Sequence, residues 1–256
     1  MNPLKIIAFT LILLLPVTAV KAQDPIELGP MDLETATALL AESDLSRGNS
    51  SGLEWDIDIE SQTEGDTEAN SLTVLVKDTN CLAEYRSPAN VKGRKLLMKD
   101  RNMWFIKPGL SKPVPISPRQ KLLGGASNGD IASTNYAGDY TIEHFTGEVL
   151  DMEPCLVYDL KAKNKNLTYD RIRYWVSQRT KTGVKAEFFT LSGKLFKTAV
   201  FEYGHKISLN GQERPFVSKM TITGAVVETE KTVMAYSRIR LRDISPSAFN
   251  LDLLVK

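Results

Sequence analysis

One serine of the chain lies in a sequence pattern that hydrolases use. Residues 125–129 read Gly-Ala-Ser-Asn-Gly and match the G-x-S-x-G nucleophile elbow around Ser127, which functions where a strand turns sharply into a helix beneath an α/β sheet. No alternation of strands and helices surrounds this match, and His144 and His205 are the only histidines able to act as a base. We therefore interpret the segment as a glycine-rich loop and keep a serine hydrolase that uses Ser127 as the least favoured alternative.

The other side chains able to do acid–base or metal chemistry form no recognisable site. Asp56 and Asp58 project from one face of a predicted strand, but alternating acids are typical of a solvated face. Two cysteines and two histidines are too few for a structural zinc site without carboxylate ligands. The sequence has no P-loop, dinucleotide fingerprint, H-E-x-x-H motif or EF-hand loop. We expect a protein that is not an enzyme, has no catalytic residue and binds no metal ion or cofactor.

The charge of the chain is almost balanced. The 256 residues include 32 Lys and Arg against 31 Asp and Glu, so no strong positive field exists to gather a nucleic acid, and we expect no nucleic-acid partner. One local exception is a strand in which Arg238, Arg240 and Arg242 alternate with Ile239 and Leu241. This cationic stripe is either a solvated outer face or a docking stripe for lipid head groups or a partner protein.

The amino terminus has the pattern of a secretory signal. A cation at Lys5 precedes the apolar run 6–15, and small residues follow at positions 20 and 22. The apolar run ends at Pro16, short of the roughly 20 residues that cross a bilayer. We expect cleavage near Ala22, which makes residues 1–22 a signal peptide and residues 23–256 a single exported domain.

The two cysteines, Cys81 and Cys155, have two interpretations. An exported chain meets oxidising conditions, in which they could form one disulfide. Both lie in strand-like runs, where a buried free cysteine behaves as a small hydrophobic residue. The sequence leaves both alternatives open.

A helix followed by many strands is the pattern of the rest of the chain. Leu33, Ala36, Leu39 and Leu40 recur at helical spacing and predict a helix over residues 33–45. From Leu53 the period changes to two, and short turn-like clusters separate the next apolar runs, as in consecutive antiparallel hairpins. Further predicted strands cover residues 72–77, 81–86, 95–98, 103–107, 140–150, 155–161, 171–177, 185–191, 195–203, 216–223 and 232–241, and a short final helix covers residues 247–254.

These elements predict a mainly β fold with a helical lid. Roughly ten to twelve strands and no βαβ alternation indicate one antiparallel sheet. A sheet of that size must curve or split, so we expect an incomplete barrel. The proline-rich segment 108–118 is confined to an edge or an irregular strap, and the segment 124–138 is a loop with at most a short helix. The amino-terminal helix and this loop–helix insertion are the candidate covers of the hollow.

Apolar residues that share a strand face are the candidates for lining this hollow. Each set lies on one face of a predicted strand because side chains alternate across a sheet, although ordinary core packing explains the same pattern. Which face of the Trp104 strand points inward is left open by the sequence. The candidates are Trp55, Ile57 and Ile59, then Val74 and Val76, then Trp104 and Ile106.

Three blocks of sequence, in this order and spacing, resemble one known family. The first is residues 87–97 (SPANVKGRKLL) with residues 103–108 (MWFIKP), similar to the family patterns P-x-x-x-K-G-R-x-L-L and M-W-x-Y-x-P. The second runs from residue 174 to residue 195, and the third covers residues 244–249 before Leu253 and Leu254. The chain thus resembles the LolA-like family of periplasmic proteins that sort outer-membrane lipoproteins. It departs from the family at residues 181–184, which lack an aromatic–proline pair, and at Ile106, which stands where the family usually has Tyr.

The resemblance implies a function as well as a fold. It implies an incomplete antiparallel barrel covered by helices, whose apolar hollow holds the acyl chains of a lipid or lipoprotein during passage through the periplasm. It also implies a monomer that passes its cargo to or from a membrane-protein partner of the envelope. The rival interpretation is a non-catalytic structural or assembly protein of the envelope with a filled core.

Overall fold

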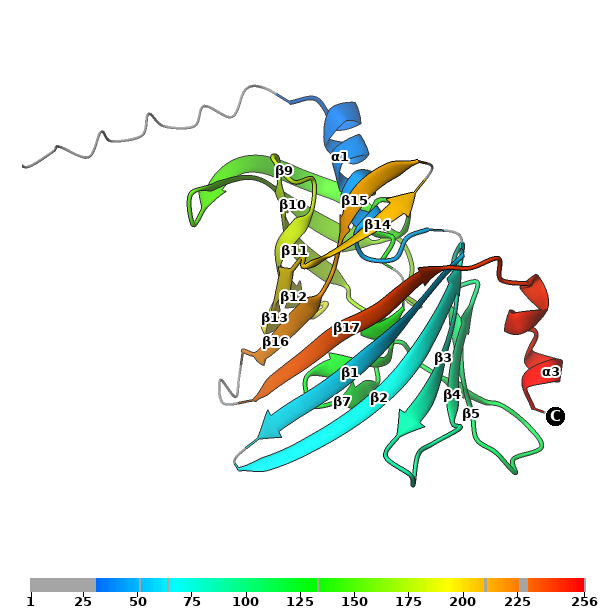
Figure 1. Cartoon of the computed structure of the whole chain (residues 1–256). Helices are drawn as coiled ribbons and strands as arrows, with labels where there is room; N and C mark the ends of the chain where they lie inside the picture. Colours follow the sequence, from blue (N-terminus) through cyan, green and yellow to red (C-terminus); the bar gives the residue numbers. More distant parts are fainter. Residues whose placement is uncertain are drawn as a thin grey trace, which may run out of the picture.

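Alternating apolar and polar residues form most of the strands in the computed structural model, which describes residues 31–50, 52–63, 65–132, 134–209, 211–225 and 230–255. The predicted signal peptide, residues 1–22, lies outside these ranges. Thirteen strands form one antiparallel sheet (Figure 1). In chain order they are β1 (Leu53–Thr63), β2 (Asp66–Lys77), β3 (Asn80–Ser87), β4 (Lys95–Lys99), β5 (Asn102–Ile106), β6 (Val114–Ile116), β9 (Tyr140–Leu150), β10 (Glu153–Ala162), β11 (Arg171–Ser177), β12 (Gly183–Phe189), β13 (Leu195–Glu202), β16 (Lys219–Gly224) and β17 (Lys231–Leu241).

The sheet consists of two antiparallel halves joined by its first and last strands. Strands β1 to β6 follow one another across one half, and β9 to β13 with β16 and β17 build the other. Strand β1 pairs with β17 from Leu53 opposite Leu241 to Gln62 opposite Lys231. The two edges of the sheet are therefore β6 and β9, and Pro115 lies in the edge strand β6, where no ladder donor is needed.

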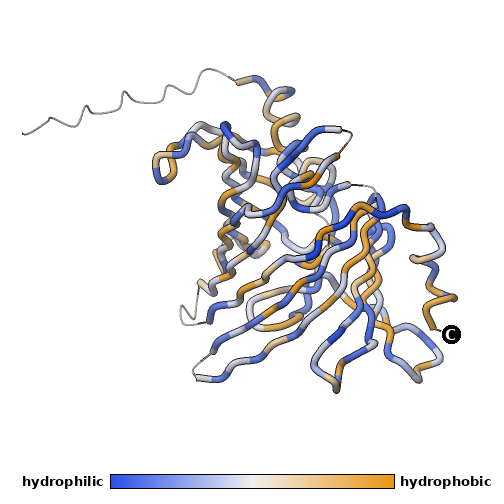
Figure 2. Tube along the Cα trace, in the orientation of Figure 1, coloured by the Kyte–Doolittle hydropathy of each residue, from blue (hydrophilic) through white to orange (hydrophobic). Residues whose placement is uncertain are grey.

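The sheet curves strongly but does not close. Irregular register in the β1–β17, β9–β10, β11–β12 and β12–β13 pairs adds local bends and twist. Figure 2 shows hydrophobic and hydrophilic residues alternating along the long strands, as expected where one face is buried. The predicted fold class, a curved antiparallel sheet forming an incomplete barrel with few helices, is confirmed. The main sheet has one strand more than the upper end of the predicted range.

The predicted amino-terminal helix is present as α1 (Leu33–Leu45). The Asp32 carboxylate caps it by accepting a hydrogen bond of 2.7 Å from the Thr35 N–H. Its face with Ala36, Leu39 and Leu40 is buried against the concave side of the sheet. The Tyr158 hydroxyl of β10 donates to the Ala36 carbonyl at 2.8 Å, so the helix is also tied to the sheet by a polar contact.

A long connection crosses the concave face because it must link the two edges of the sheet. Residues 117–139, named here the crossing segment, run from the end of β6 to the start of β9. They contain the small hairpin β7 (Lys121–Leu123) and β8 (Ala126–Ser127), the 3₁₀ helix η1 (Asn128–Ile131) and the short helix α2 (Tyr136–Asp139). The segment 124–138, predicted as a loop–helix insertion, is the central part of it.

The remaining elements are a second hairpin and the carboxyl-terminal helices. Strands β14 (His205–Leu209) and β15 (Gln212–Phe216) form a separate two-stranded sheet. The 3₁₀ helix η2 (Pro246–Phe249) and helix α3 (Leu251–Leu254) occupy the predicted final helix and lie outside the sheet (Figure 1). Cys81 and Cys155 are two free, buried thiols, so the disulfide alternative is wrong. No helix of the described ranges has the length and apolar character needed to cross a membrane.

Candidate functional site

The concave face of the sheet has an apolar floor made by β1 and β2. Trp55, Ile57, Ile59, Val74 and Val76 are each at most 2% exposed and belong to one hydrophobic cluster. The register of the two strands sets Trp55 opposite Val74, so their side chains are cross-strand neighbours. The structure therefore brings together five of the seven residues that the sequence indicated for the hollow.

Trp104 and Ile106 do not join this floor. They lie on the outer face of β5, in a second cluster that includes Leu97, Ile244 and Phe249. Met103 and Phe105 are the residues of β5 that pack with the main cluster. The alternation could not assign the face, because the carboxyl-terminal segment covers the outer side of β4 and β5 and makes both faces apolar.

Three structures cover the floor, one more than the sequence indicated. Helix α1 and the crossing segment are the two predicted covers, and the β14–β15 hairpin is the third. Ile207, Leu209 and Phe216 of this hairpin are buried in the main cluster. Arg214 on the hairpin forms an ion pair of 3.1 Å with Glu42 of α1, which fastens the two covers together. The alternation of Ile207 and Leu209 before a turn was the available signal for this hairpin.

A buried ion pair fastens the crossing segment to the sheet. The Lys197 ammonium on β13 donates to the Asp130 carboxylate at 2.9 Å and to the Gly125 carbonyl at 2.8 Å. The Tyr169 hydroxyl donates to the other oxygen of Asp130, and the Lys197 ammonium lies 4.8 Å from the centre of the Tyr169 ring. Breaking such a pair leaves an uncompensated buried charge, which costs about 3–5 kcal/mol.

Ser127 belongs to this cluster and is positioned as an acceptor. Its hydroxyl oxygen lies 3.2 Å from the Lys197 ammonium, and its backbone N–H donates to Asp130 at 2.8 Å. The Lys197 ammonium, which also donates to the Asp130 carboxylate, is the donor in its contact with the Ser127 hydroxyl oxygen. His205, one of the two candidate bases, instead contacts the Tyr236 carbonyl at 2.8 Å. The contacts of Ser127 belong to a hydrogen-bonded ion pair. This serine is the last residue of β8 and precedes the 3₁₀ helix η1, but the sheet there is a two-stranded antiparallel hairpin and not the α/β sheet of a nucleophile elbow.

A second polar cluster lies where α1 ends. The Asp44 carboxylate accepts the Ala137 N–H of α2 at 2.9 Å, which joins two covers of the hollow. Burial raises the pKa of Asp44 to about 7, although hydrogen bonds from the backbone of Ala137 and Tyr136 oppose the rise. One oxygen of this carboxylate has no hydrogen-bond partner.

Arg47, one turn later, is a buried cation held among aromatic rings. Its guanidinium lies 4.1 Å from the ring centre of Phe201 and 5.4 Å from that of Tyr136. Among the ion pairs of the described residues none joins Arg47 to a carboxylate, and its Nη1 has no hydrogen-bond partner. Contacts with rings contribute about 0.5–2 kcal/mol each, which is less than the several kcal/mol that burying an uncompensated ion costs.

One small cavity with both polar and apolar walls lies inside the hollow. This cavity of about 40 Å³ lies beside these clusters, and Arg47, Arg101, Asp130, Tyr136, Asp139 and Tyr169 are among the residues that line it. Pockets that hold small molecules usually measure about 300–1,000 Å³. This cavity is therefore too small for an acyl chain while the covers stay in place. Within the described part of the chain no three His, Cys, Asp or Glu side chains gather to hold a metal ion.

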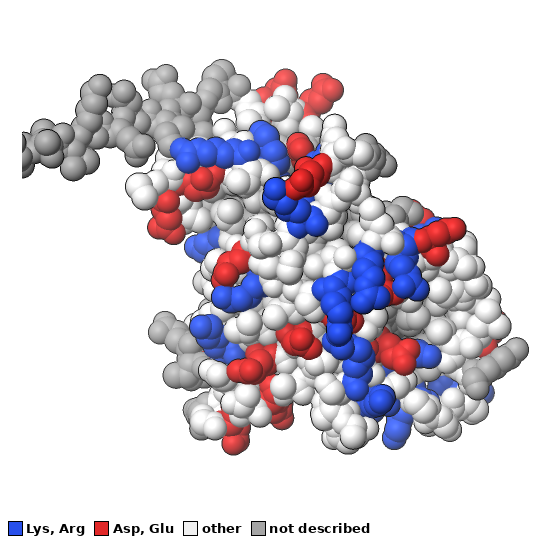
Figure 3. Space-filling model, viewed as in Figure 1, with Lys and Arg blue, Asp and Glu red and all other residues white. Residues whose placement is uncertain are grey.

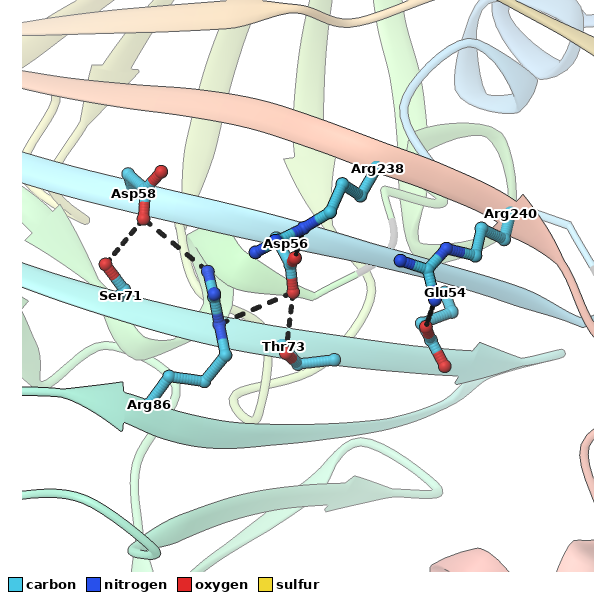
Figure 4. A network of polar contacts seen from close by, with 8 residues as sticks. All are labelled: Glu54, Asp56, Asp58, Ser71, Thr73, Arg86, Arg238 and Arg240. Atoms are coloured by element: carbon cyan, nitrogen blue, oxygen red, sulfur yellow. Dashed lines mark hydrogen bonds and ion pairs between the residues drawn. The ribbon is translucent and has the colours of Figure 1, made fainter.

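Arg238 and Arg240 of the predicted arginine stripe lie on the outer face of β17, together with carboxylates of β1 (Figure 4), and Arg242 follows the end of this strand. Thr232, Met234 and Tyr236 of β17 are buried, and a bulge opposite Trp55, with Arg238 at a φ of 51°, turns the following Arg238 and Arg240 to the outer face. Arg238 pairs with Asp56, and Arg240 and Arg242 pair with Glu54 at 3.1 and 3.5 Å.

Arg86 of β3 extends this network across the sheet. It contacts Asp56 at 3.4 Å and Asp58 at 3.5 Å, so four arginines share three carboxylates. Figure 3 shows Lys and Arg atoms gathered on this outer face, over β17, β1 and the neighbouring strands. The arginine side chains are about a third to a half exposed, whereas those of Asp56 and Glu54 are only 9% and 14% exposed. The cost of taking these carboxylates out of water offsets much of the attraction, so the network is a weak source of stability.

Comparison with solved structures places this architecture in a family. A LolA superfamily protein from Nitrosomonas europaea is 30% identical to this chain, and the match covers 85% of this chain and 98% of that protein with a TM-score of 0.76. The chain belongs to the LolA superfamily. A family model described as "Uncharacterized protein" also matches residues 77–256. The resemblance to LolA-like proteins in the sequence is thus confirmed.

Two more distant structures share the fold of this LolA superfamily member. A DUF1329 family protein from Desulfovibrio piger is 20% identical with a TM-score of 0.71, over 86% of this chain and 98% of that one. A putative outer membrane lipoprotein-sorting protein domain from Vibrio parahaemolyticus is 16% identical with a TM-score of 0.73, over the same shares. No curated protein matches the sequence.

Proposed function

We propose that this LolA superfamily protein is a periplasmic, non-enzymatic carrier that binds acyl chains of a lipid or lipoprotein in the hollow of its sheet. The observation that carries the proposal is the apolar floor of β1 and β2 beneath covers that are separate from the sheet in sequence. The family membership and the lipoprotein-sorting name of the Vibrio structure support it. The signal-like amino terminus supports export, and the resemblance to LolA-like proteins supports a monomer.

Cargo enters the filled hollow by displacing the covers from the floor. Burying an acyl chain of about 16 carbons is worth about 13 kcal/mol at about 0.8 kcal/mol per methylene. Displacing the covers exposes side chains such as Leu40, Leu123 and Ile131, each worth about 1.5–3 kcal/mol. The two terms are of the same order, so loading and release are close to balanced, as hand-over requires.

The outer stripe completes the proposed cycle. We assign Arg238, Arg240 and Arg242 as the docking surface for acidic groups of an envelope membrane protein that gives or receives cargo. About half of each side chain is exposed beside its carboxylate partner. Transfer of cargo to envelope membranes should then slow with rising salt, and Arg242→Gln should slow it without changing cargo affinity.

Single-tryptophan variants test the carrier directly. The chain has three tryptophans, Trp55, Trp104 and Trp175, and replacing two of them by Phe isolates the third. A fatty acid with bromine atoms on its acyl chain should quench the fluorescence of Trp55, which lies on the floor. Trp175, which lies in a separate cluster with Cys155 and Val157, is the matched control and should keep its fluorescence.

The same experiment separates carrier from scaffold. The filled core equally suits a structural protein of the envelope, and that alternative predicts no quenching of any tryptophan and no lipid in native mass spectra of the gently purified protein. Equal quenching of Trp55 and Trp175 would show adsorption to the surface and would also remove the proposal. Quenching of Trp104 would assign the outer cluster of Trp104 and Ile106 to the cargo as well.

A further inference from the structure

Several buried hydrogen-bond donors of the described residues have no acceptor, and two of them share aromatic neighbours inside the hollow. One is Nη1 of Arg47, whose side chain lines the small cavity, and the other is the hydroxyl of Tyr174. The Tyr174 ring lies 5.0 Å from the Tyr136 ring and 6.2 Å from the Phe201 ring, and these are the two rings that the Arg47 guanidinium contacts. The two donors therefore belong to one aromatic pocket.

Among the described residues no acid around this pocket forms an ion pair with Arg47, although one oxygen of Asp44 has no hydrogen-bond partner. Asp44 accepts the Ala137 N–H, Asp130 accepts from Lys197 and Tyr169, and Asp139 pairs with Arg101 at 2.9 Å. Guanidinium groups remain cationic when buried and prefer oxygen anions that accept two hydrogen bonds. A hollow built only for hydrocarbon has no use for such a cation on its inner side.

We propose that Arg47, with Tyr174, binds the anionic head group of the cargo inside the hollow, so that the ligand is an amphiphile with a carboxylate or phosphate beside its acyl chain. This inference rests on the proposed carrier function and names the chemical class of its cargo. Arg47 is the last charged residue before β1. A head group bound to it therefore lies near Trp55, at the end of the floor where β1 starts. Residue Gly48 supports this placement, because a side chain at this position would meet the Trp55 ring.

Paired ligands that differ only in charge test the proposal. We would measure the affinity of the full mature chain for laurate, dodecyl phosphate and methyl laurate by displacement of a fluorescent fatty acid. A hydrogen bond to a charged group corresponds to about a ten- to hundredfold change in affinity, so the two anions should bind about tenfold or more tightly than the neutral ester. Inorganic phosphate alone should displace nothing, and displacement by it would overturn the amphiphile in favour of a small-anion site.

Arg47→Gln should abolish this preference. The ratio between laurate and methyl laurate should fall to about one, while the affinity for the ester stays within about threefold. Arg119→Gln is the matched control, because Arg119 fastens the crossing segment through Asp170 and the Leu167 carbonyl and does not line the cavity. Loosening a cover changes both affinities by the same factor, so an equal change in Arg47→Gln would reduce Arg47 to a fastening role and refute the proposal.

A measurement on the wild-type protein remains decisive if Arg47→Gln does not fold. The carboxyl ¹³C resonance of labelled laurate should titrate at lower pH in the complex than in the free monomer, because a nearby cation favours the carboxylate. A carboxyl group buried without a cation would titrate at higher pH, which would contradict the inference. If no ligand binds the wild type at all, the carrier function itself fails; if all bind equally, the function stands and the head-group site does not.

Discussion

Replacing Asp44 by asparagine tests the description of the hollow's covers in one titration. The substitution removes the ionisable group but keeps an oxygen that accepts the Ala137 N–H. Burial raises the pKa of Asp44 from 3.8 to about 7 in the folded protein, a shift of about three units. At about 1.36 kcal/mol per unit, the group is linked to an upper limit of about 4 kcal/mol of pH-dependent stability.

The sign follows from proton counting. Between about pH 4 and pH 7 the folded protein holds a proton on Asp44 that the unfolded chain has lost, so this contribution is fully present below about pH 4 and is lost as the pH rises through about 7. We therefore expect the free energy of unfolding of the wild type, relative to Asp44→Asn, to decrease over this interval.

Urea unfolding at several pH values, followed by tryptophan fluorescence, measures this difference. Asp66→Asn, an exposed position at the start of β2, is the control and should change little. A difference between wild type and Asp44→Asn that is constant with pH would refute the reasoning. A difference that grows with pH would show that Asp44 is held as a carboxylate by Arg47, which would also remove the unpaired cation from the hollow.

Two further substitutions probe how the crossing segment is held. Lys197→Met should cost about 3–5 kcal/mol of unfolding free energy because it leaves Asp130 buried without its cation, and Lys197→Met with Asp130→Asn should regain part of that loss; full cost in the double variant would mean that the pair is not the cause. Gly124→Ala should cost about 1–3 kcal/mol because its methyl group would overlap the side-chain oxygens of Ser61 and Thr232, and hydrogen exchange at residues 125–131 should quicken. Gly211→Ala, at a φ of 77° with open space around it, carries the backbone strain alone, and an equal cost there would contradict the packing argument.

The part of the fold that depends on local pattern was predictable from the sequence. The alternation from Leu53 to Ile59 indicated both the strand and its buried face, and the proline-rich segment 108–118 indicated an edge, where β6 is found. Arg238, Arg240 and Arg242 were expected on one face, and the bulge at Arg238 explains how Arg238 and Arg240 reach it. These features depend on neighbours a few residues away.

The features that were missed depend on long-range contacts. The outward orientation of Trp104 follows from coverage by Phe249, more than 140 residues later in the chain. The pairing of β1 with β17 makes β6 and β9 the opposite edges of the sheet. The crossing segment, which connects these edges, therefore runs across the concave face and fills part of the hollow. Arg47 and Tyr174 come to lie around the same aromatic rings only when α1 packs on the sheet. No spacing in the sequence indicates this arrangement.

The two main covers are anchored to the sheet in different ways, and this limits how the hollow opens. Helix α1 is followed by β1 at its carboxyl end, whereas the crossing segment continues into a rim strand at each end, β6 on one side and β9 on the other. The crossing segment therefore cannot open about one end as a hinged lid does, because lifting it from the floor pulls on both β6 and β9. The distance between these two edge strands is thus coupled to whatever occupies the hollow. A protein that binds β6 or β9 would therefore respond to whether the hollow is loaded.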